Sequence, residues 1–166
     1  LDVYDIVLES LASNEAVLSG EERNLGVALV DFGGGTTDMA VCSRGAIKHT
    51  SVLALGGDNL TYDISIGTRT PTLEAERIKI KYGCALTSMI GKDETIEVPG
   101  VGGRKARVLP RQILGEILEP RVEEIFTLIQ NDLIRSGYED MVNSGVEITG
   151  GQAELPGVPE IAEQIF

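Results

Sequence analysis

The sequence has no tryptophan, a single histidine and only two cysteines, and these shortages restrict its chemistry. Cys42 and Cys84 lie far apart in apolar surroundings, without cysteine or histidine neighbours at the spacing of zinc ligands. They are therefore predicted to be reduced, buried packing residues. His49 lies on a predicted strand among polar residues, which favours a structural role over a catalytic one. Aromatic residues make up 4% of the chain, so the core is predicted to be aliphatic.

Positive charge and long apolar runs are also scarce. The chain has 14 lysines and arginines against 26 aspartates and glutamates, a net charge of −12, which argues against a general nucleic-acid-binding surface. No apolar run approaches the roughly 18 to 20 residues that a membrane-spanning helix needs. The chain begins at Leu1 rather than at a methionine and ends within a predicted helix, Pro159–Phe166, so we expect a fragment of a longer protein.

Among the features that are present, the stretch from Val27 to Val41 is the most informative. A short apolar run, Val27–Val30, leads to Asp31, three glycines, two threonines, Asp38 and a second apolar run. This pattern predicts two strands joined by a tight turn. Glycine permits a positive φ and lets a ligand approach the backbone closely, so the turn is a candidate binding loop.

The turn favours phosphate as its ligand. Successive backbone N–H groups at Gly33, Gly34, Gly35 and Thr36 are typical of an anion-binding nest, and Asp31 is positioned to hold a hydrated Mg²⁺. The alternative is a β-hairpin that needs glycine only for its turn, for which one or two glycines suffice. The loop is not a Walker A motif, because no lysine-serine pair follows and a strand rather than a helix comes next.

Hydrophobic periodicity, glycine and proline predict the remaining elements. In the first part of the chain we expect a strand at 5–9, a helix at 11–18, a charged loop at 19–24, and strands at 39–43 and 46–55. Two helices are then expected to begin at Gly56 and at Thr70. The last part is expected to contain hairpin strands at 95–98 and 104–109, a helix at 110–136 kinked at Pro120, and a strand at 146–149.

Three further groups of residues are ambiguous from the sequence pattern alone. Glu76 and Lys79 share a helix face, and their spacing favours an exposed ion pair. Gly150 and Gly151 follow a predicted strand, which permits close approach of a ligand but is a weak signal. A basic cluster is equally consistent with a solubilising surface and with a docking patch for an acidic peptide; it comprises Arg104, Lys105, Arg107 and Arg111.

The motifs resemble a known family. The segment Asp31–Asp38, DFGGGTTD, resembles the second phosphate loop of the actin-like and sugar-kinase-like ATPases. Four other segments, Leu11–Leu18, Thr70–Lys79, Tyr82–Ala85 and Ile117–Arg121, look like the bacterial cell-division family FtsA, and the resemblance covers essentially the whole chain in order. No sugar-binding constellation stands out, so a sugar kinase is disfavoured.

The resemblance implies an α/β fold, one half of an actin-like molecule. It divides the chain into a ribonuclease-H-like nucleotide-binding core at 1–58 and 141–166 (subdomain 2A) and an inserted helical subdomain with a short β-hairpin at 59–140 (subdomain 2B). It also implies ATP and Mg²⁺, the cation being held through water by Asp31. The implied nucleotide contacts are Gly33, Gly34, Gly35 and Thr36 for the phosphates, and Glu76, Lys79, Gly150 and Gly151 for adenosine.

No catalytic residue is assigned. Actin-like ATPases bind nucleotide between two halves, and no second Asp-x-Gly-[Ser/Thr] loop occurs here. We therefore expect weak nucleotide binding at best and no meaningful hydrolysis by this chain alone. The resemblance implies at most a weak ATPase for the intact protein.

The resemblance implies several partners. The family tethers FtsZ filaments to the inner membrane, so we expect docking of the FtsZ C-terminal tail, with Arg121, Arg111 and Arg107 as candidate contacts. The intact protein is expected to self-associate into actin-like filaments on the cytoplasmic face of the membrane, which it would contact only through an amphipathic tail absent here. The alternative is half of another actin-like ATPase, of the pilus-assembly, rod-shape or chaperone type.

Overall fold

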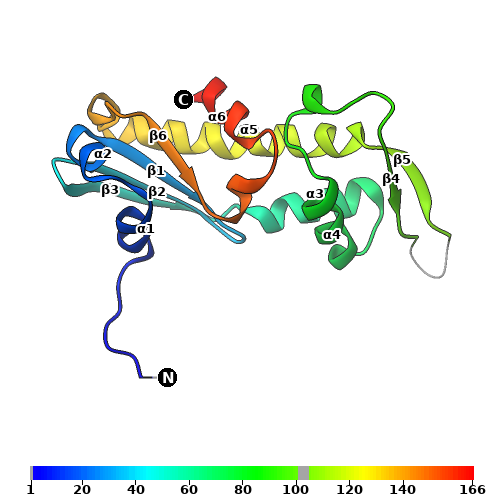
Figure 1. The fold of residues 1–166 in the computed structure, drawn as a ribbon, viewed down its shortest axis with the longest axis horizontal. Coiled ribbons are helices and arrows are strands. Elements are labelled where there is room, and N and C mark those ends of the chain that lie inside the picture. The colour runs from blue at the N-terminus through cyan, green and yellow to red at the C-terminus, as the bar shows by residue number, and fades with distance from the viewer. Residues whose placement is uncertain (1, 101–104) are drawn as a thin grey trace.

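The computed structural model describes residues 2–100 and 105–166 and has a mixed α/β fold (Figure 1). A four-stranded sheet lies at one end of the molecule, and a group of helices with a two-stranded hairpin lies at the other. The longest helix, α5 (Gln112–Ser136), runs beside both parts. Within the described residues no helix is long and apolar enough to cross a membrane.

The four-stranded sheet has the order β3-β2-β1-β6. Strands β1 (Val27–Phe32), β2 (Thr37–Ser43) and β3 (Ala46–Leu53) form an antiparallel meander, as the sequence predicted. Strand β6 (Val146–Thr149) pairs with β1 in parallel, with Asp31 opposite Thr149. The C-terminal ends of β1 and β6 therefore lie side by side, at the end of the sheet from which the glycine loop extends.

The sheet is covered on both faces, and its strand β1 is therefore buried on both sides. Its residues Ala28, Val30 and Phe32 belong to the main core, where the Phe32 ring meets Phe126 of α5 edge-on at 5.6 Å between centroids. On the opposite face Val27 and Leu29 form a small separate cluster with Leu18 and Cys42. That face carries the short helices α1 (Glu9–Val17) and α2 (Gly20–Leu25).

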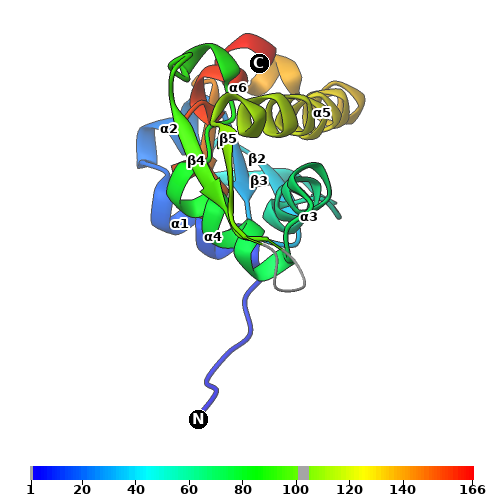
Figure 2. The same ribbon diagram turned by 90° about the vertical axis from the view of Figure 1, so that its right-hand side faces the viewer.

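The second part of the molecule is mainly helical (Figure 2). Helices α3 (Gly57–Thr68) and α4 (Thr72–Tyr82) pack against each other, and α3 also packs on α5. The hairpin pairs β4 (Thr95–Val98) with β5 (Arg107–Pro110). The remaining elements are the short 3₁₀ helices η1 (Thr87–Met89), η2 (Glu139–Met141) and η3 (Gly151–Glu154), and the helix α6 (Val158–Ile165).

Helix α5 begins at Gln112 and continues through Pro120, whose ring lies on the exposed side. The prediction of a long amphipathic helix is therefore confirmed, because the buried residues follow the helical repeat from Leu114 to Leu133. All of α5 lies within the predicted 59–140 subdomain, yet its Phe126 packs on Phe32 of the sheet, which belongs to the other predicted subdomain. The division into 1–58 with 141–166 and 59–140 stays a prediction.

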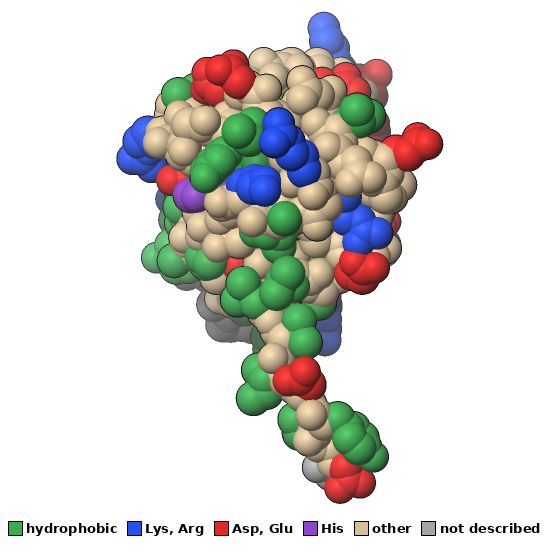
Figure 3. Space-filling model, turned by 90° about the vertical axis from the view of Figure 1, so that its left-hand side faces the viewer, with side chains coloured by type: hydrophobic (Ala, Val, Ile, Leu, Met, Phe, Trp, Pro, Cys, Tyr) green, Lys and Arg blue, Asp and Glu red, His purple; other side chains and the backbone are tan. Residues whose placement is uncertain are grey.

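Two local predictions were wrong. Residues 5–8 form no strand; the segment before α1 is extended and projects from the body, with hydrophobic side chains on its surface (Figure 3). No described strand lies beside it to complete a ladder, which a strand needs for its backbone hydrogen bonds. The charged segment 19–24 forms α2 rather than a loop, because Ser19 and Glu22 make a reciprocal capping box.

Both cysteines are free and buried, as the sequence predicted. Cys42 lies in the small cluster beneath α1 and α2, where burial raises the pKa of its thiol despite the nearby positive charges of Arg23 and Lys48. Cys84 follows α4 and is equally shielded from solvent. Neither thiol is positioned to act as a nucleophile.

Candidate functional site

The glycine loop between β1 and β2 leaves open space above its backbone. A Cβ atom added to Gly34 or Gly35 would meet no heavy atom within 4 Å. Neither residue has the positive φ that the sequence pattern suggested, because the positive-φ glycines lie elsewhere in the described chain. These glycines therefore matter for the room they leave rather than for an unusual conformation.

The loop is held from behind by the start of α3. The N–H groups of Gly57 and Asp58 donate to the carbonyl oxygens of Gly33 and Gly34, at 3.0 and 2.7 Å. In a trans peptide the C=O and the following N–H point in opposite directions. The N–H groups of Gly34 and Gly35 therefore point away from α3, and they donate to no other backbone group of the described residues.

Gly56 makes this arrangement possible. A Cβ atom there would lie 2.6 Å from the Gly34 carbonyl oxygen and 2.9 Å from that of Gly33. Only glycine lets the chain entering α3 approach the loop so closely. The glycine pair at 56–57 thus supports the loop, and the first N–H groups of α3 are used by protein acceptors.

The second glycine pair lies directly beside Asp31. Gly150 has a φ of +91°, and a Cβ atom on it would lie 2.5 Å from the Phe32 carbonyl oxygen and 2.6 Å from Asp31 Oδ1. Gly151, by contrast, leaves open space. The parallel pairing of β1 with β6 produces this contact, because it carries Thr149 level with Asp31.

The side chain of Lys79, from α4, reaches the start of α3 beside the glycine loop. Its ammonium group donates to the Gly57 carbonyl at 2.9 Å and to Thr61 Oγ1 at 2.8 Å, and it pairs with Glu76 Oε2 at 2.8 Å. Three acceptors match the three N–H groups of an ammonium ion. The side chain is 4% exposed, so Lys79 ties α4 to the start of α3 inside the protein.

Glu76 is the more accessible member of the pair, with 40% of its side chain exposed. Partial burial acts to raise the pKa of its carboxyl group, but hydrogen bonds from Lys79 and Thr61 and the charge of Lys79 outweigh burial. The net result is a pKa below the ordinary value for glutamate, so Glu76 is held as a carboxylate.

The three clusters predicted from the sequence are thus brought together. Gly150 touches Asp31, Lys79 bonds to Gly57, and the loop that follows η3 packs on the end of α4, where the Ala85 N–H donates to the Pro156 carbonyl at 2.7 Å. These contacts join segments that lie up to 120 residues apart in the sequence.

Three residues at this place were not found from the sequence. Ser13 of α1 donates from its hydroxyl to Asp31 Oδ2 at 2.9 Å, Thr61 binds both Lys79 and Glu76, and the Gln152 side chain lies against Gly57. A helix periodicity argument could have placed Thr61 one turn from Gly57. Nothing in the local pattern marks Ser13, whose partner lies 18 residues away.

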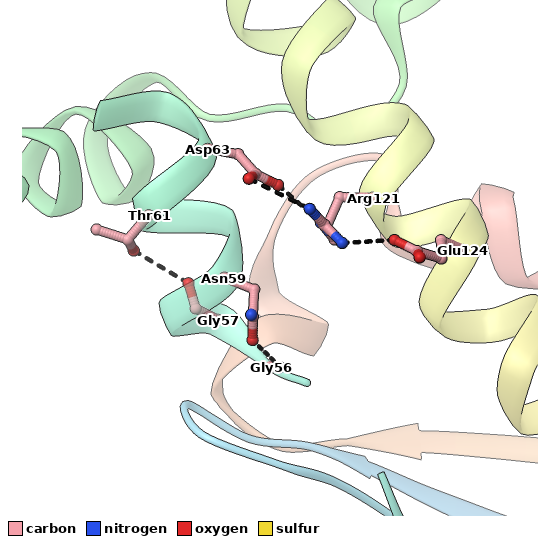
Figure 4. A network of polar contacts seen from close by, with 7 residues as sticks. All are labelled: Gly56, Gly57, Asn59, Thr61, Asp63, Arg121 and Glu124. Atoms are coloured by element: carbon pink, nitrogen blue, oxygen red, sulfur yellow. Dashed lines mark hydrogen bonds and ion pairs between the residues drawn. The ribbon is translucent and has the colours of Figure 1, made fainter. Parts of the chain in front are cut away.

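The candidate partner residue Arg121 makes an ion-pair network between α3 and α5 (Figure 4). Its guanidinium binds Asp63 through two nitrogens, at 2.7 and 3.3 Å, and Glu124 at 2.5 Å. The hydrogen bond to Asp63 is the main reason that the pKa of Arg121 is raised. Arg121 keeps 29% of its side chain exposed, at the junction of the two helices.

The other two candidate arginines are also engaged within the protein. Arg111 donates to the Tyr82 carbonyl at 2.8 Å and pairs with Glu94 at 2.6 Å. Arg107 donates to the Thr68 carbonyl. The structure therefore does not gather Arg107, Arg111 and Arg121 into one free basic patch, and Arg104 of the predicted cluster lies outside the described residues.

The β3-β2-β1-β6 sheet and the converging glycine loops define this as a protein with an actin-like fold. MreB5 of Spiroplasma citri bound to ADP superposes with a TM-score of 0.70 at 20% identity, covering 94% of this chain and 50% of that one. The ethanolamine utilization protein EutJ of Carboxydothermus hydrogenoformans gives 0.68 at 24% identity, covering 96% and 46%. At such identities the likeness concerns the fold alone.

Sequence relatives identify the family. The model of the family "Cell division protein FtsA" matches residues 28–166, so the chain belongs to the FtsA family. The FtsA of Pseudomonas aeruginosa is 54% identical over the whole chain, and those of Escherichia coli and Bacillus subtilis are 42% and 43% identical. This chain spans 38–41% of the length of these relatives.

Proposed function

We propose that this chain is the second nucleotide-binding half of an actin-like cell-division protein. The observation that carries the proposal is the orientation of the Gly34 and Gly35 N–H groups. They point away from the carbonyls that α3 holds and donate to no backbone group of the described residues, the space in which Gly34 and Gly35 would carry a Cβ atom is open, and Asp31 lies at the base of the same loop. Paired N–H groups beside a fixed carboxylate suit a phosphate group together with a divalent cation.

The residues have distinct roles in this proposal. Gly34 and Gly35 bind the phosphates of ATP through their N–H groups, and Asp31 holds Mg²⁺ through water. Gly33 and Thr36, which the sequence also assigned to the phosphates, close the turn instead, because the Gly33 N–H donates to the Thr36 carbonyl at 3.0 Å. Adenosine lies between Gly150–Gly151 and the exposed Glu76 of α4. Lys79 acts indirectly, because its ammonium is buried among protein acceptors and fixes both Glu76 and the carbonyl of Gly57.

The donor set at Asp31 fits the cation. Carboxylate and hydroxyl oxygens are ligands that Mg²⁺ accepts, and the ion usually keeps several waters and takes few protein groups. Asp31 is only partly buried, and the Thr36 hydroxyl lies on the same turn, where it donates to Asp38 at 2.7 Å. When bound, Mg²⁺ would supply positive charge to the phosphate oxygens.

We expect the isolated chain to bind nucleotide weakly and not to hydrolyse it, because a cleft between two halves has only one wall here. Hydrolysis, filament formation, and attachment of FtsZ to the cytoplasmic face of the inner membrane are proposals for the whole protein. The −12 charge argues against nucleic acid as a partner.

The test is a titration of Mg²⁺-ATP followed by amide chemical shifts, comparing Gly35→Ala with the parent chain. We expect a dissociation constant of about 1 mM for the parent and at least about tenfold weaker binding for the variant. The added methyl group meets no protein atom, so it blocks ligand access without disturbing the fold.

Gly20→Ala is the matched control, since its methyl group also meets no atom within 4 Å but lies at the start of α2. The control should bind like the parent, with shifts concentrated at 33–36 and 150–151. Equal binding by Gly35→Ala and the parent would refute the phosphate assignment.

We further propose that the junction of α3 and α5 around Arg121 docks the FtsZ C-terminal tail. Membership of the FtsA family supports the partner, and the exposed Arg121–Glu124 pair offers a guanidinium that a peptide carboxylate can share. Because Arg121 already binds Asp63, docking requires exchange or sharing of that contact rather than capture by an unoccupied arginine.

Calorimetric titration of the tail peptide should give micromolar binding, weakened about tenfold by Arg121→Gln. Arg135→Gln is the control, because it removes another i, i+3 arginine-carboxylate pair from α5 near the sheet. Equal losses in both variants would indicate general destabilisation. No binding by a chain that still binds nucleotide would remove this surface from consideration.

A further inference from the structure

Helix α1 is oriented with its polar side inward. Its buried residues are Ser10 and Asn14, 9% and 4% exposed, whereas Leu11 and Val17 are 48% and 43% exposed. A helix on the surface of a core ordinarily buries its apolar face. Hydrophobic burial therefore does not explain which side of α1 faces the sheet.

The polar side of α1 lies at the end of the sheet that carries the glycine loop. Leu18, just after the helix, packs with Val27 at the start of β1, and Ser13 reaches Asp31 near the end of β1. Helix α1 thus runs opposite to β1. Ser10 lies one turn beyond Ser13 on the same face, which brings it farther toward the loop.

Asp31 is hydrogen-bonded at one carboxylate oxygen and lies beside the Gly150 backbone at the other. Oδ2 accepts the Ser13 hydroxyl at 2.9 Å, and Oδ1 lies so close to Gly150 that a Cβ atom there would approach it to 2.6 Å. The hydrogen bond from Ser13 therefore favours one orientation of the carboxylate. Such support from outside the ligand set commonly controls how tightly a carboxylate binds a cation.

Two more polar atoms on this side of α1 are buried and have no hydrogen-bond partner among the described residues, namely Ser10 Oγ and Asn14 Nδ2. An unsatisfied buried polar group costs about 1–3 kcal/mol, so a helix would not retain two of them for packing alone. The Ser10 hydroxyl, on the loop side of Ser13, can bind a water molecule that a hydrated cation keeps.

We propose that Ser13 is a positioning residue for the cation-binding carboxylate Asp31, and that Ser10, one turn closer to the loop, extends this polar wall toward water held next to the carboxylate. The inference rests on the proposed function of Asp31. Ser13 donates one hydrogen bond to Oδ2 and so orients the carboxylate, while Asp31 as a whole is only partly buried.

The experiment measures the gain in ADP affinity that Mg²⁺ produces, as the ratio of dissociation constants in EDTA and in excess Mg²⁺. Ser13→Ala should reduce this gain about tenfold and leave the affinity in EDTA unchanged. Ser13→Thr, which keeps the hydroxyl, should restore most of it. A purely structural role would change both affinities together.

Ser65→Ala is the matched control. It also removes a serine hydroxyl and one hydrogen bond, from Ser65 Oγ to the Thr70 carbonyl at 2.8 Å, but eight residues along α3 from Gly57. An unchanged Mg²⁺ effect in a folded Ser13→Ala variant, or an equal loss in Ser65→Ala, would overturn the assignment of Ser13.

A second readout separates this inference from the proposed function. Mn²⁺ alone is titrated into the chain, and paramagnetic broadening of the amide signals at 31–36 is followed. If Ser13→Ala needs a higher Mn²⁺ concentration than the parent chain for the same broadening, the positioning role is supported even if ADP does not bind. Equal broadening in variant and parent contradicts that role, and ADP binding without any Mn²⁺ effect contradicts the cation site itself.

Discussion

At the scale of single residues, the two glycines that follow β6 differ in whether the fold tolerates a side chain at their position. Gly150 needs to be glycine for the fold, because its φ of +91° and its contact with the Phe32 carbonyl exclude a side chain. Gly151 has neither restriction. The sequence shows the two as an identical pair, so only the structure distinguishes the one that holds Asp31 from the one that leaves space.

This difference predicts that Gly150→Ala lowers the free energy of unfolding by about 2 kcal/mol or more, through backbone strain and the clash with Phe32. Gly151→Ala should change it by less than about 0.5 kcal/mol. Urea denaturation of both variants measures the two values. Similar values for both would mean that the backbone at Gly150 relaxes without cost.

At the scale of elements, α3 and α4 are joined by a charged contact rather than by apolar packing alone. Glu76, Lys79 and Thr61 form it beside the start of α3. The folded pKa of Glu76 is lowered, so the stability that it contributes is present above its unfolded pKa and is lost as the pH falls through the folded pKa.

We therefore expect Glu76→Gln to lower stability at neutral pH and to flatten its loss on acidification below about pH 4.5, the usual range of glutamate. Urea midpoints from pH 7 to pH 3 measure this. Glu116→Gln, at an exposed position on α5, is the control and should keep the slope of the parent. An identical slope for Glu76→Gln would contradict the lowered pKa.

Helices, strands and turns were predictable from the sequence where the pattern of neighbouring residues determines them. Strands β1 to β3 and helix α5 follow from apolar periodicity, and the loop at 33–35 follows from its glycines. Helix α2 was missed although Ser19 and Glu22 carry a capping-box signal. The pairing of Arg121 with Asp63, 58 residues away, and the burial of Lys79 depend on how α3, α4 and α5 pack, which no local pattern contains.

At the scale of the whole molecule, α5 and α3 connect the two candidate surfaces. Helix α3 begins against the glycine loop and presents Asp63 to Arg121 farther along, while α5 carries Arg121 and then packs on the sheet through Phe126. The nucleotide loop and the proposed docking junction are therefore parts of one packed unit, although the sequence separates their residues.

The position of β6 at the edge of the sheet affects how copies of the chain interact with one another in solution. Its outer row of peptide groups pairs with no described strand, and an apolar hollow of about 640 Å³, lined in part by Val146, Ile148 and Phe166, lies beside it. Such an edge is a template on which another copy can add a strand. The −12 charge opposes that encounter by mutual repulsion. Because added salt shortens the range of this repulsion from about 10 Å at 0.1 M to about 3 Å at 1 M, the colloidal behaviour of the chain depends on ionic strength.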